Sequence, residues 1–364
     1  MWTKPYGTTG KNISVIGFGG MRFGVPEKID EMAEVVLHAH QQGVNYFDTA
    51  PGYCQDKSED IMGAAFKQMP RDSFYASTKC SSPDAGKLRQ SLEASLKRLN
   101  LEKIDFFHIW CVVTLDAWQK RLSGGAVAEA LKAKSEGLVD HVTVSSHLQG
   151  NELSDVLEEG YFEGVTLGYC AINFPYRQKA LDTAAKLNLG VVTMNPLGGG
   201  LIPQNPEQFD FLRAPADKTV VEAAIRFNVS NPAVTCALVG FSNKQQVDDA
   251  VEAVRNFQPY SESHVDGLRE KISDSFDGLC TGCGYCLPCP EGVPIPKLMD
   301  AYNHIILNSS QRLTDRLAWH WQLKPSDAEA CSLCGACEAK CTQHLPIRKR
   351  LKEIVEQGRK EQQQ

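Results

Sequence analysis

Short apolar segments alternate with amphipathic helical patterns through the first 255 residues, and this alternation limits the fold more than any other feature. The segments expected to form strands are residues 14–18, 44–48, 74–78, 105–110, 141–145, 165–169, 191–194 and 237–240. A stripe of Leu88, Leu92, Leu96 and Leu99 is typical of the helices between them. Strands that alternate with helices form parallel sheets, and these repeated units predict a closed (β/α)8 barrel, the TIM-barrel form of the α/β class.

Two runs of four cysteines mark a second unit after the barrel. The runs are Cys280, Cys283, Cys286 and Cys289, and then Cys331, Cys334, Cys337 and Cys341. Cysteines at steps of three, with a fourth nearby, allow a short loop to give one thiolate to each iron of a [4Fe–4S] cube. The alternative is zinc, whose four thiolates usually come from two Cys-x-x-Cys knuckles separated by a longer stretch. Each run is compact, so we predict two [4Fe–4S] clusters.

The fourth cysteine of each run is expected to bind the cluster of the other run, because this crossing is typical of two-cluster ferredoxins. One cluster then has Cys280, Cys283, Cys286 and Cys341, and the other has Cys331, Cys334, Cys337 and Cys289.

Apolar helical stripes in residues 297–307 and 347–355 predict that the second unit is mostly α-helical. We therefore expect a barrel over residues 1–255, a connecting segment over 256–275, and a small helical ferredoxin-like domain with the two clusters over 276–364.

Charge and hydropathy restrict the partners. The formal net charge is −6 and no basic tail or basic–aromatic run is present, so we expect no nucleic acid. No segment approaches the roughly 18 uncharged apolar residues of a membrane span, so we expect no membrane insertion. The first residues lack the apolar core of a secretory signal, which predicts a reducing, cytoplasmic location.

Three polar side chains fall at the ends of neighbouring expected strands, where barrel active sites lie: Asp48, Tyr53 and Lys79. A lysine ammonium lowers the pKa of a nearby phenol, and a carboxylate holds the lysine in place. The phenol is then suited to act as a general acid toward a carbonyl oxygen that receives a hydride. Each residue alone is also common at strand ends, in caps and on surfaces, so the prediction depends on all three together.

These residues lie within segments through which the chain resembles the aldo/keto reductases, in the branch that carries a C-terminal iron–sulfur domain. The matching segments are Gly-Phe-Gly-Gly-Met at 17–21, Asn-Tyr-Phe-Asp-Thr-Ala-Pro-Gly-Tyr at 45–53, Ala-Ser-Thr-Lys at 76–79, Val-Ser-Ser-His at 144–147 and Met-Asn-Pro-Leu-Gly-Gly-Gly at 194–200. The resemblance implies NADP(H) or NAD(H) as cofactor and an aldehyde, ketone or alcohol as small-molecule substrate. It assigns Tyr53 as proton donor, Lys79 as the residue that tunes it, and Asp48 as the support of Lys79.

The resemblance also implies which residues contact the nucleotide: Gly20, Met21, Ser145, Ser146, Asn195, Leu197, Gly199 and Gln246. Ser145 and Ser146 fall where the family holds the nicotinamide amide, and Leu197 and Gly199 where it cradles the pyrophosphate. Gln246 stands where many members place an arginine for the 2′-phosphate, which leaves the choice between NADP and NAD open.

The fourth catalytic position of the family, usually a histidine, corresponds to Trp110 in this chain. His108 lies two residues earlier and on the same face of the strand, because strand side chains alternate. His108 is therefore a second candidate, provided that a bulge lifts it to the barrel mouth. The alternative, which we favour, is a buried histidine with hydrogen-bonding partners.

A hydride carries two electrons and an iron–sulfur cluster passes one, so three functions are open. The first is a nicotinamide-dependent carbonyl reductase whose clusters are structural or peripheral. The second is an enzyme that receives single electrons from a ferredoxin-type redox partner and does not use hydride chemistry. The third is a nucleotide-binding electron-transfer subunit. The intact set of Asp48, Tyr53 and Lys79 favours the first.

Overall fold

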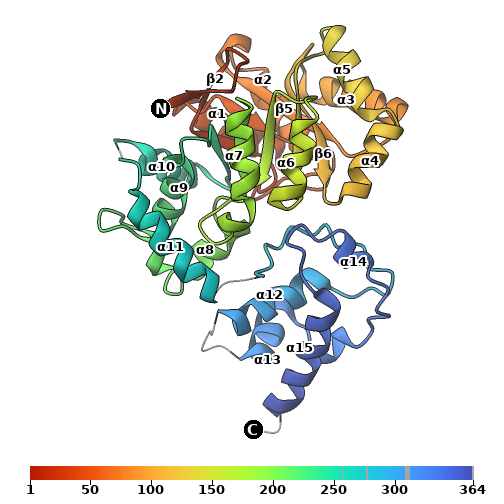
Figure 1. Cartoon of the computed structure of the whole chain (residues 1–364), viewed down its shortest axis with the longest axis vertical. Coiled ribbons are helices and arrows are strands. Elements are labelled where there is room, and N and C mark those ends of the chain that lie inside the picture. Colours follow the sequence, from red (N-terminus) through yellow and green to blue (C-terminus); the bar gives the residue numbers. More distant parts are fainter. Residues whose placement is uncertain (257, 276–277, 308–311, 363–364) are drawn as a thin grey trace.

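The computed structural model describes residues 1–256, 258–275, 278–307 and 312–362. Among these residues, eight parallel strands close into a barrel in the order β10-β3-β4-β5-β6-β7-β8-β9 (Figure 1). The barrel strands are β3 (Ile16–Gly19), β4 (Tyr46–Asp48), β5 (Tyr75–Cys80), β6 (Ile104–Val112), β7 (Val139–Ser146), β8 (Gly164–Gly168), β9 (Gly190–Met194) and β10 (Cys236–Gly240). The predicted (β/α)8 barrel is confirmed.

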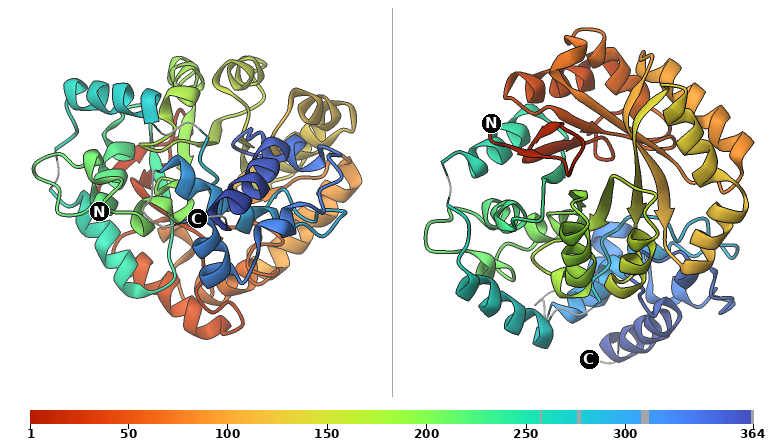
Figure 2. Two further views of the ribbon diagram at one scale, coloured as in Figure 1. Left: turned by 90° about the horizontal axis from the view of Figure 1, so that it is seen from below. Right: turned by 45° about the horizontal axis from the view of Figure 1, so that its top comes forward.

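Helices follow the strands and form the outer ring of the barrel (Figure 2). They are α1 (Ile29–Gln41), α2 (Ser58–Phe66), α3 (Ala85–Leu99), α4 (Leu115–Ser123), α5 (Ala126–Ser135), α6 (Gly150–Glu158), α7 (Gln178–Lys186), α8 (Leu201–Gln204), α9 (Val220–Ser230) and α10 (Lys244–Val254). Their apolar stripes are buried against the strands; Leu88, Leu92, Leu96 and Leu99 of α3, for example, all belong to the barrel core.

An N-terminal hairpin closes the bottom of the barrel. Its strands β1 (Thr3–Pro5) and β2 (Asn12–Ser14) pair antiparallel. Tyr6, in the hairpin loop, is fully buried and packs on Phe106 of β6. A Cβ atom on Gly164 or Gly190 would lie about 2.1–2.2 Å from the Tyr6 side chain, so β8 and β9 need glycine at these positions. With the bottom filled, the opposite end is the open mouth.

The segment 256–275, expected to be a connection, contains helix α11 (Glu262–Ser275). Leu268 and Ile272 of this helix are buried with the barrel core. The barrel unit therefore extends beyond residue 255.

The C-terminal residues form a separate, mostly helical unit with a core of its own (Figure 1). Its helices are α12 (Ile295–Ile306), α13 (Leu313–Asp315), a π-helical turn (Arg316–Trp321), α14 (Ala336–Ala339) and α15 (Ile347–Gln362). Leu298 and Met299 of α12 meet Leu351 and Ile354 of α15 in this core, as their helical stripes predict. The unit contacts the barrel at the C-terminal ends of the strands, through the loop that carries the first cysteine run.

Candidate active site

A buried ion pair joins the ends of β4 and β5. The Lys79 ammonium donates to both carboxylate oxygens of Asp48, at 2.5 and 2.7 Å, and both residues are about 3% exposed. The pairing follows from the fold, because adjacent parallel strands bring their ends to one edge. Ser77 also donates to Asp48, at 2.8 Å, so the carboxylate is held from two sides. This geometry fixes the ammonium beneath the barrel mouth.

His108 lies below this pair and does not reach the mouth. It is fully buried, with Nε2 at 2.8 Å from the Ser77 hydroxyl and Nδ1 at 2.7 Å from the Thr143 hydroxyl. Burial lowers the pKa of His108 well below its usual value, and the nearby Lys79 ammonium lowers it further, so the ring is neutral. The register shift of β6 falls between Ile109 and Val112, beyond His108, so no bulge lifts its ring.

Tyr53 stands above the ion pair, on the loop between β4 and α2. The Lys79 ammonium lies 5.4 Å from the centre of its ring. Burial raises the pKa of the Tyr53 phenol well above 10, and the nearby Tyr285 and Asp48 raise it further. Tyr53 is therefore protonated at neutral pH, as a general acid must be before it gives up its proton.

Trp110 packs edge-on against Tyr53, with ring centres 5.5 Å apart and an interplanar angle of 84°. The irregularity of β6 that follows places Cys111 at a φ of +57°. Arg121 of α4 donates to the carbonyl oxygens of Trp110 and Ser81, at 2.7 and 3.2 Å. These contacts hold the backbone of Trp110 and place its indole beside Tyr53.

A cavity of about 480 Å³ opens at the mouth, within the size range of small-molecule and cofactor sites. Of the residues expected to hold the nucleotide, those that line it are Gly20, Met21, Asn195, Leu197, Gly199 and Gln246. Asp48 and Tyr53 lie at its inner end. A Cβ atom on Gly20 would lie 2.4 Å from the Ser58 hydroxyl, so this wall needs glycine. The bare backbone and the open volume suit a dinucleotide.

Ser145 and Ser146, expected at the nicotinamide amide, do not line this cavity. Both are buried, and the Ser146 hydroxyl donates to the Val112 carbonyl and accepts from the Leu148 amide, both at 3.1 Å. The next residue, His147, does line the cavity, and its Nδ1 atom has no hydrogen-bonding partner among the described residues. Burial lowers the pKa of His147 to about 3, so its ring is neutral.

The residues that line the cavity outside the set predicted to bind the nucleotide include Arg22, Asp249, Cys283 and Tyr285. Arg22 follows the predicted contact Met21, and Asp249 lies three residues after the predicted contact Gln246. Their closeness in the sequence to these residues is the signal by which both could have been predicted. Cys283 is predicted only as an iron ligand, and Tyr285 carries no signal for this site. Both reach the barrel mouth because the C-terminal unit folds over it.

The loop of the first cysteine run packs tightly on the barrel. A Cβ atom on Gly199 would lie 2.3 Å from the Thr281 carbonyl oxygen, so the glycine admits this loop. On the other side, Arg177 donates to the Thr342 carbonyl at 3.4 Å, and Nε2 of His344 lies 3.0 Å from the His147 carbonyl. Contacts from both cysteine-bearing segments therefore hold the second unit against the mouth.

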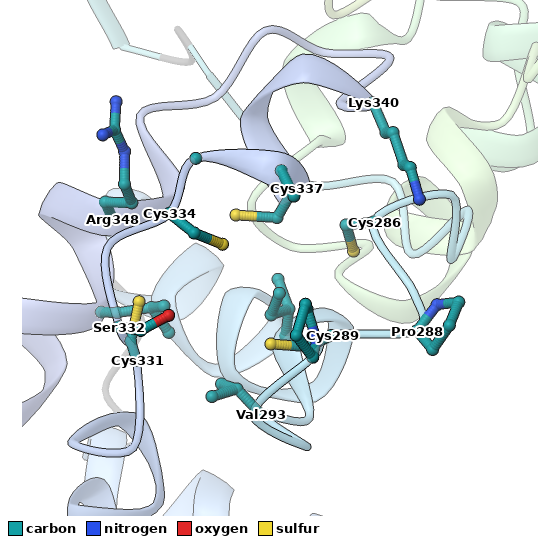
Figure 3. Close-up of a pocket in the computed structure, with 15 residues that line it drawn as sticks. Cys286, Pro288, Cys289, Val293, Cys331, Ser332, Cys334, Cys337, Lys340 and Arg348 are labelled. Carbon is teal, nitrogen blue, oxygen red and sulfur yellow. The ribbon is translucent and has the colours of Figure 1, made fainter.

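The cysteines gather in two groups that mix the two runs. Burial raises the pKa of the Cys280 thiol to about 12, and nearby Cys283, Cys341 and Cys286 act in the same direction, so these four thiols lie close together. The second group consists of Cys289, Cys331, Cys334 and Cys337. Together with Cys286, these residues line a small cavity, and sulfur atoms from both runs point into it (Figure 3).

The donor set of this unit fits iron–sulfur clusters. Zinc draws all its ligands to one ion, whereas a cube spreads four thiolates over four irons. Lys340 and Arg348 flank the second group and supply positive charge beside it (Figure 3).

Comparison with known protein families gives two matches that cover most of the chain. The aldo/keto reductase family matches residues 15–273, and the 4Fe–4S dicluster domain matches residues 279–345. In the part of the chain that the structure describes, we find no helix with the length and hydropathy of a membrane span.

Several characterised proteins are similar to the barrel part. L-galactose dehydrogenase of Arabidopsis thaliana is 28% identical over 70% of this chain and 88% of its own length. An NADH-specific methylglyoxal reductase of Escherichia coli is 25% identical over 54% of this chain and 68% of its own. Among solved structures, an aldo-keto reductase from Bacillus halodurans in its holo form covers 74% of this chain and 96% of its own, with a TM-score of 0.64 and 22% identity.

Proposed function

The chain belongs to the aldo/keto reductase family and carries a 4Fe–4S dicluster domain, and from this premise we propose that it reduces an aldehyde or ketone with a nicotinamide cofactor. The observation that carries the proposal is the stack of Asp48, Lys79 and Tyr53 at the inner end of the cavity. The same residues serve the reverse reaction, the oxidation of an alcohol.

Each residue of the stack has a distinct part in this proposal. A reduced nicotinamide bound in the cavity supplies a hydride to the carbonyl carbon. Tyr53 gives its proton to the carbonyl oxygen, and Lys79 stabilises the phenolate that remains. Asp48 holds Lys79 in place through its two hydrogen bonds to the ammonium. Gly20, Asn195, Leu197 and Gly199 are the proposed backbone and side-chain contacts of the nucleotide.

We further propose that the cofactor is NAD(H). At the outer part of the cavity, the neutral Gln246 and the carboxylate of Asp249 lie next to each other on α10. A carboxylate repels the 2′-phosphate of NADP and accepts hydrogen bonds from the free 2′-hydroxyl of NAD. The NADH-specific relative of Escherichia coli supports the same choice.

The test is an anaerobic assay of the purified protein with NADH or NADPH and methylglyoxal, and with NAD and L-galactose, the compounds named for the relatives. We expect one of these compounds to be turned over, with a kcat/KM for NADH at least about tenfold above that for NADPH, a difference of about 1.4 kcal/mol. Absence of turnover with both nucleotides, across a wider panel of aldehydes and ketones, would contradict the function. Preference for NADPH would contradict only the cofactor assignment.

We propose two [4Fe–4S] clusters with crossed ligation, as the gathering of the eight thiols supports. The crossed arrangement predicts that Cys280→Ser and Cys341→Ser disturb the same cluster, whereas Cys289→Ser and Cys331→Ser disturb the other. Electron paramagnetic resonance of the reduced variants should therefore give two matching pairs of spectra. Cys54→Ser, a half-buried thiol of the barrel, is the control with full iron content. If the spectrum of Cys341→Ser instead matches that of Cys331→Ser, each run binds its own cluster and the ligation is not crossed.

A second candidate function is one-electron chemistry with a ferredoxin-type partner. The observation in its favour is that Cys283, a proposed iron ligand, lines the same cavity as Tyr53. An anaerobic titration with NADH separates the two functions. Loss of the visible cluster absorbance on addition of NADH alone favours the one-electron function, and clusters that stay oxidised favour simple carbonyl reduction. The partner and the cytoplasmic location stay predictions.

A further inference from the structure

Tyr285 comes from the cysteine-rich loop but belongs by position to the barrel cavity. It lies between Cys283 and Cys286, and its ring packs between two residues of the mouth. The ring centres of Tyr285 and Trp110 are 6.3 Å apart, and those of Tyr285 and His147 are 5.8 Å apart. Tyr285 lines the cavity together with Asp48 and Tyr53. A residue of the second unit thus forms part of the site where the carbonyl must bind.

The Tyr285 hydroxyl lies near the proton donor. The Tyr53 phenol and the Trp110 indole, which is a donor only, are the polar side chains that act on it. A tyrosine hydroxyl carries one proton and two lone pairs, so it accepts and donates hydrogen bonds at the same time. Because Tyr285 lines the cavity, its O–H can turn toward a substrate bound there.

We propose that Tyr285 is a further catalytic residue, which donates a second hydrogen bond to the substrate oxygen beside Tyr53. This inference rests on the proposed carbonyl reduction. The carbonyl carbon gains the hydride, the oxygen takes the proton of Tyr53, and Tyr285 keeps its own proton while its O–H stabilises the charge that develops on oxygen. His108 cannot supply this bond, because it is buried and both of its ring nitrogens already have hydroxyl partners.

The position of Tyr285 also gives the cysteine-rich loop a role at the active site. The loop is anchored on the barrel by the close approach of Thr281 to Gly199, and on the second unit by Cys280 and Asn303, whose side chain bonds the Cys280 amide and carbonyl at 2.9 Å. The proposed iron ligands on both sides of Tyr285 hold its backbone. The hydroxyl is therefore positioned without relying on a flexible segment.

The decisive variant is Tyr285→Phe, which keeps the ring between Trp110 and His147 and removes only the hydroxyl. We expect kcat/KM for the carbonyl substrate to fall by roughly 10²-fold, the usual effect of losing one oxyanion donor, with unchanged iron content and unchanged affinity for NADH. Tyr302→Phe, on α12 of the same unit with its hydroxyl on Glu353, is the matched control and should keep wild-type activity. A wild-type kcat/KM in Tyr285→Phe would overturn the proposal and leave Tyr285 with a packing role only. Full activity of Tyr53→Phe would instead remove the proposed function, so the two failures are distinguishable.

Discussion

Replacing Tyr53 with phenylalanine is expected to lower kcat for carbonyl reduction by about 10²–10⁴-fold, the range that general acids contribute. The phenol is protonated, lies above the Lys79 ammonium and faces the cavity, and no other group of the described mouth combines these three properties. The ring of phenylalanine preserves the edge-on contact with Trp110, so the loss should appear in kcat and leave the affinity for NADH unchanged.

Steady-state kinetics and nucleotide binding, both under anaerobic conditions, check this result. Tyr161→Phe, an exposed tyrosine on the outer surface of the barrel, is the control and should match the wild type. The pH dependence of kcat gives a second test of Tyr53. The pKa of Tyr53 lies above 10, so the acid form persists through neutral pH and its loss limits reduction only on the alkaline side. Undiminished kcat in Tyr53→Phe would exclude Tyr53 as the proton donor.

The barrel was predictable from the sequence because its signals are local. Apolar segments bounded by turns, such as 191–194 in β9, identify strands without knowledge of their partners. The end of β6 is different: the prediction stopped at residue 110, whereas the strand continues to Val112 through a shift of register against β7. Such a shift is decided by pairing with another strand, which a single segment does not encode.

The same distinction separates the site residues that were predicted from those that were not. Asp48 and Lys79 meet because neighbouring strand ends share one edge of the sheet. Ser146 is the last residue of β7, but its hydroxyl is bonded to the backbone of Val112 and Leu148, and His147 lines the cavity in its place. Tyr285 reaches Tyr53 only through the docking of the second unit, a long-range contact for which hydrophobic periodicity gives no signal.

Lys79→Met is expected to lower the free energy of unfolding by about 3–5 kcal/mol, because it leaves the Asp48 carboxylate buried without its cation. The methionine side chain is similar in length, so the packing around it changes little. Urea denaturation of the protein with its clusters intact, followed by circular dichroism under anaerobic conditions, measures the effect. Lys120→Met, which breaks an exposed pair with Asp116 on α4, is the control and should leave stability nearly unchanged.

The double variant Lys79→Met with Asp48→Asn separates charge from packing. Removing both charges eliminates the unpaired carboxylate, and the asparagine side chain still accepts from Ser77, so most of the lost stability should return. Activity should not return, because neither partner that acts on Tyr53 remains. If the double variant is as unstable as Lys79→Met, the loss arises from packing and the ion pair is not the cause. If stability returns and activity does not, the Asp48–Lys79 pair is needed for the reaction itself, because it supports the proton donor Tyr53.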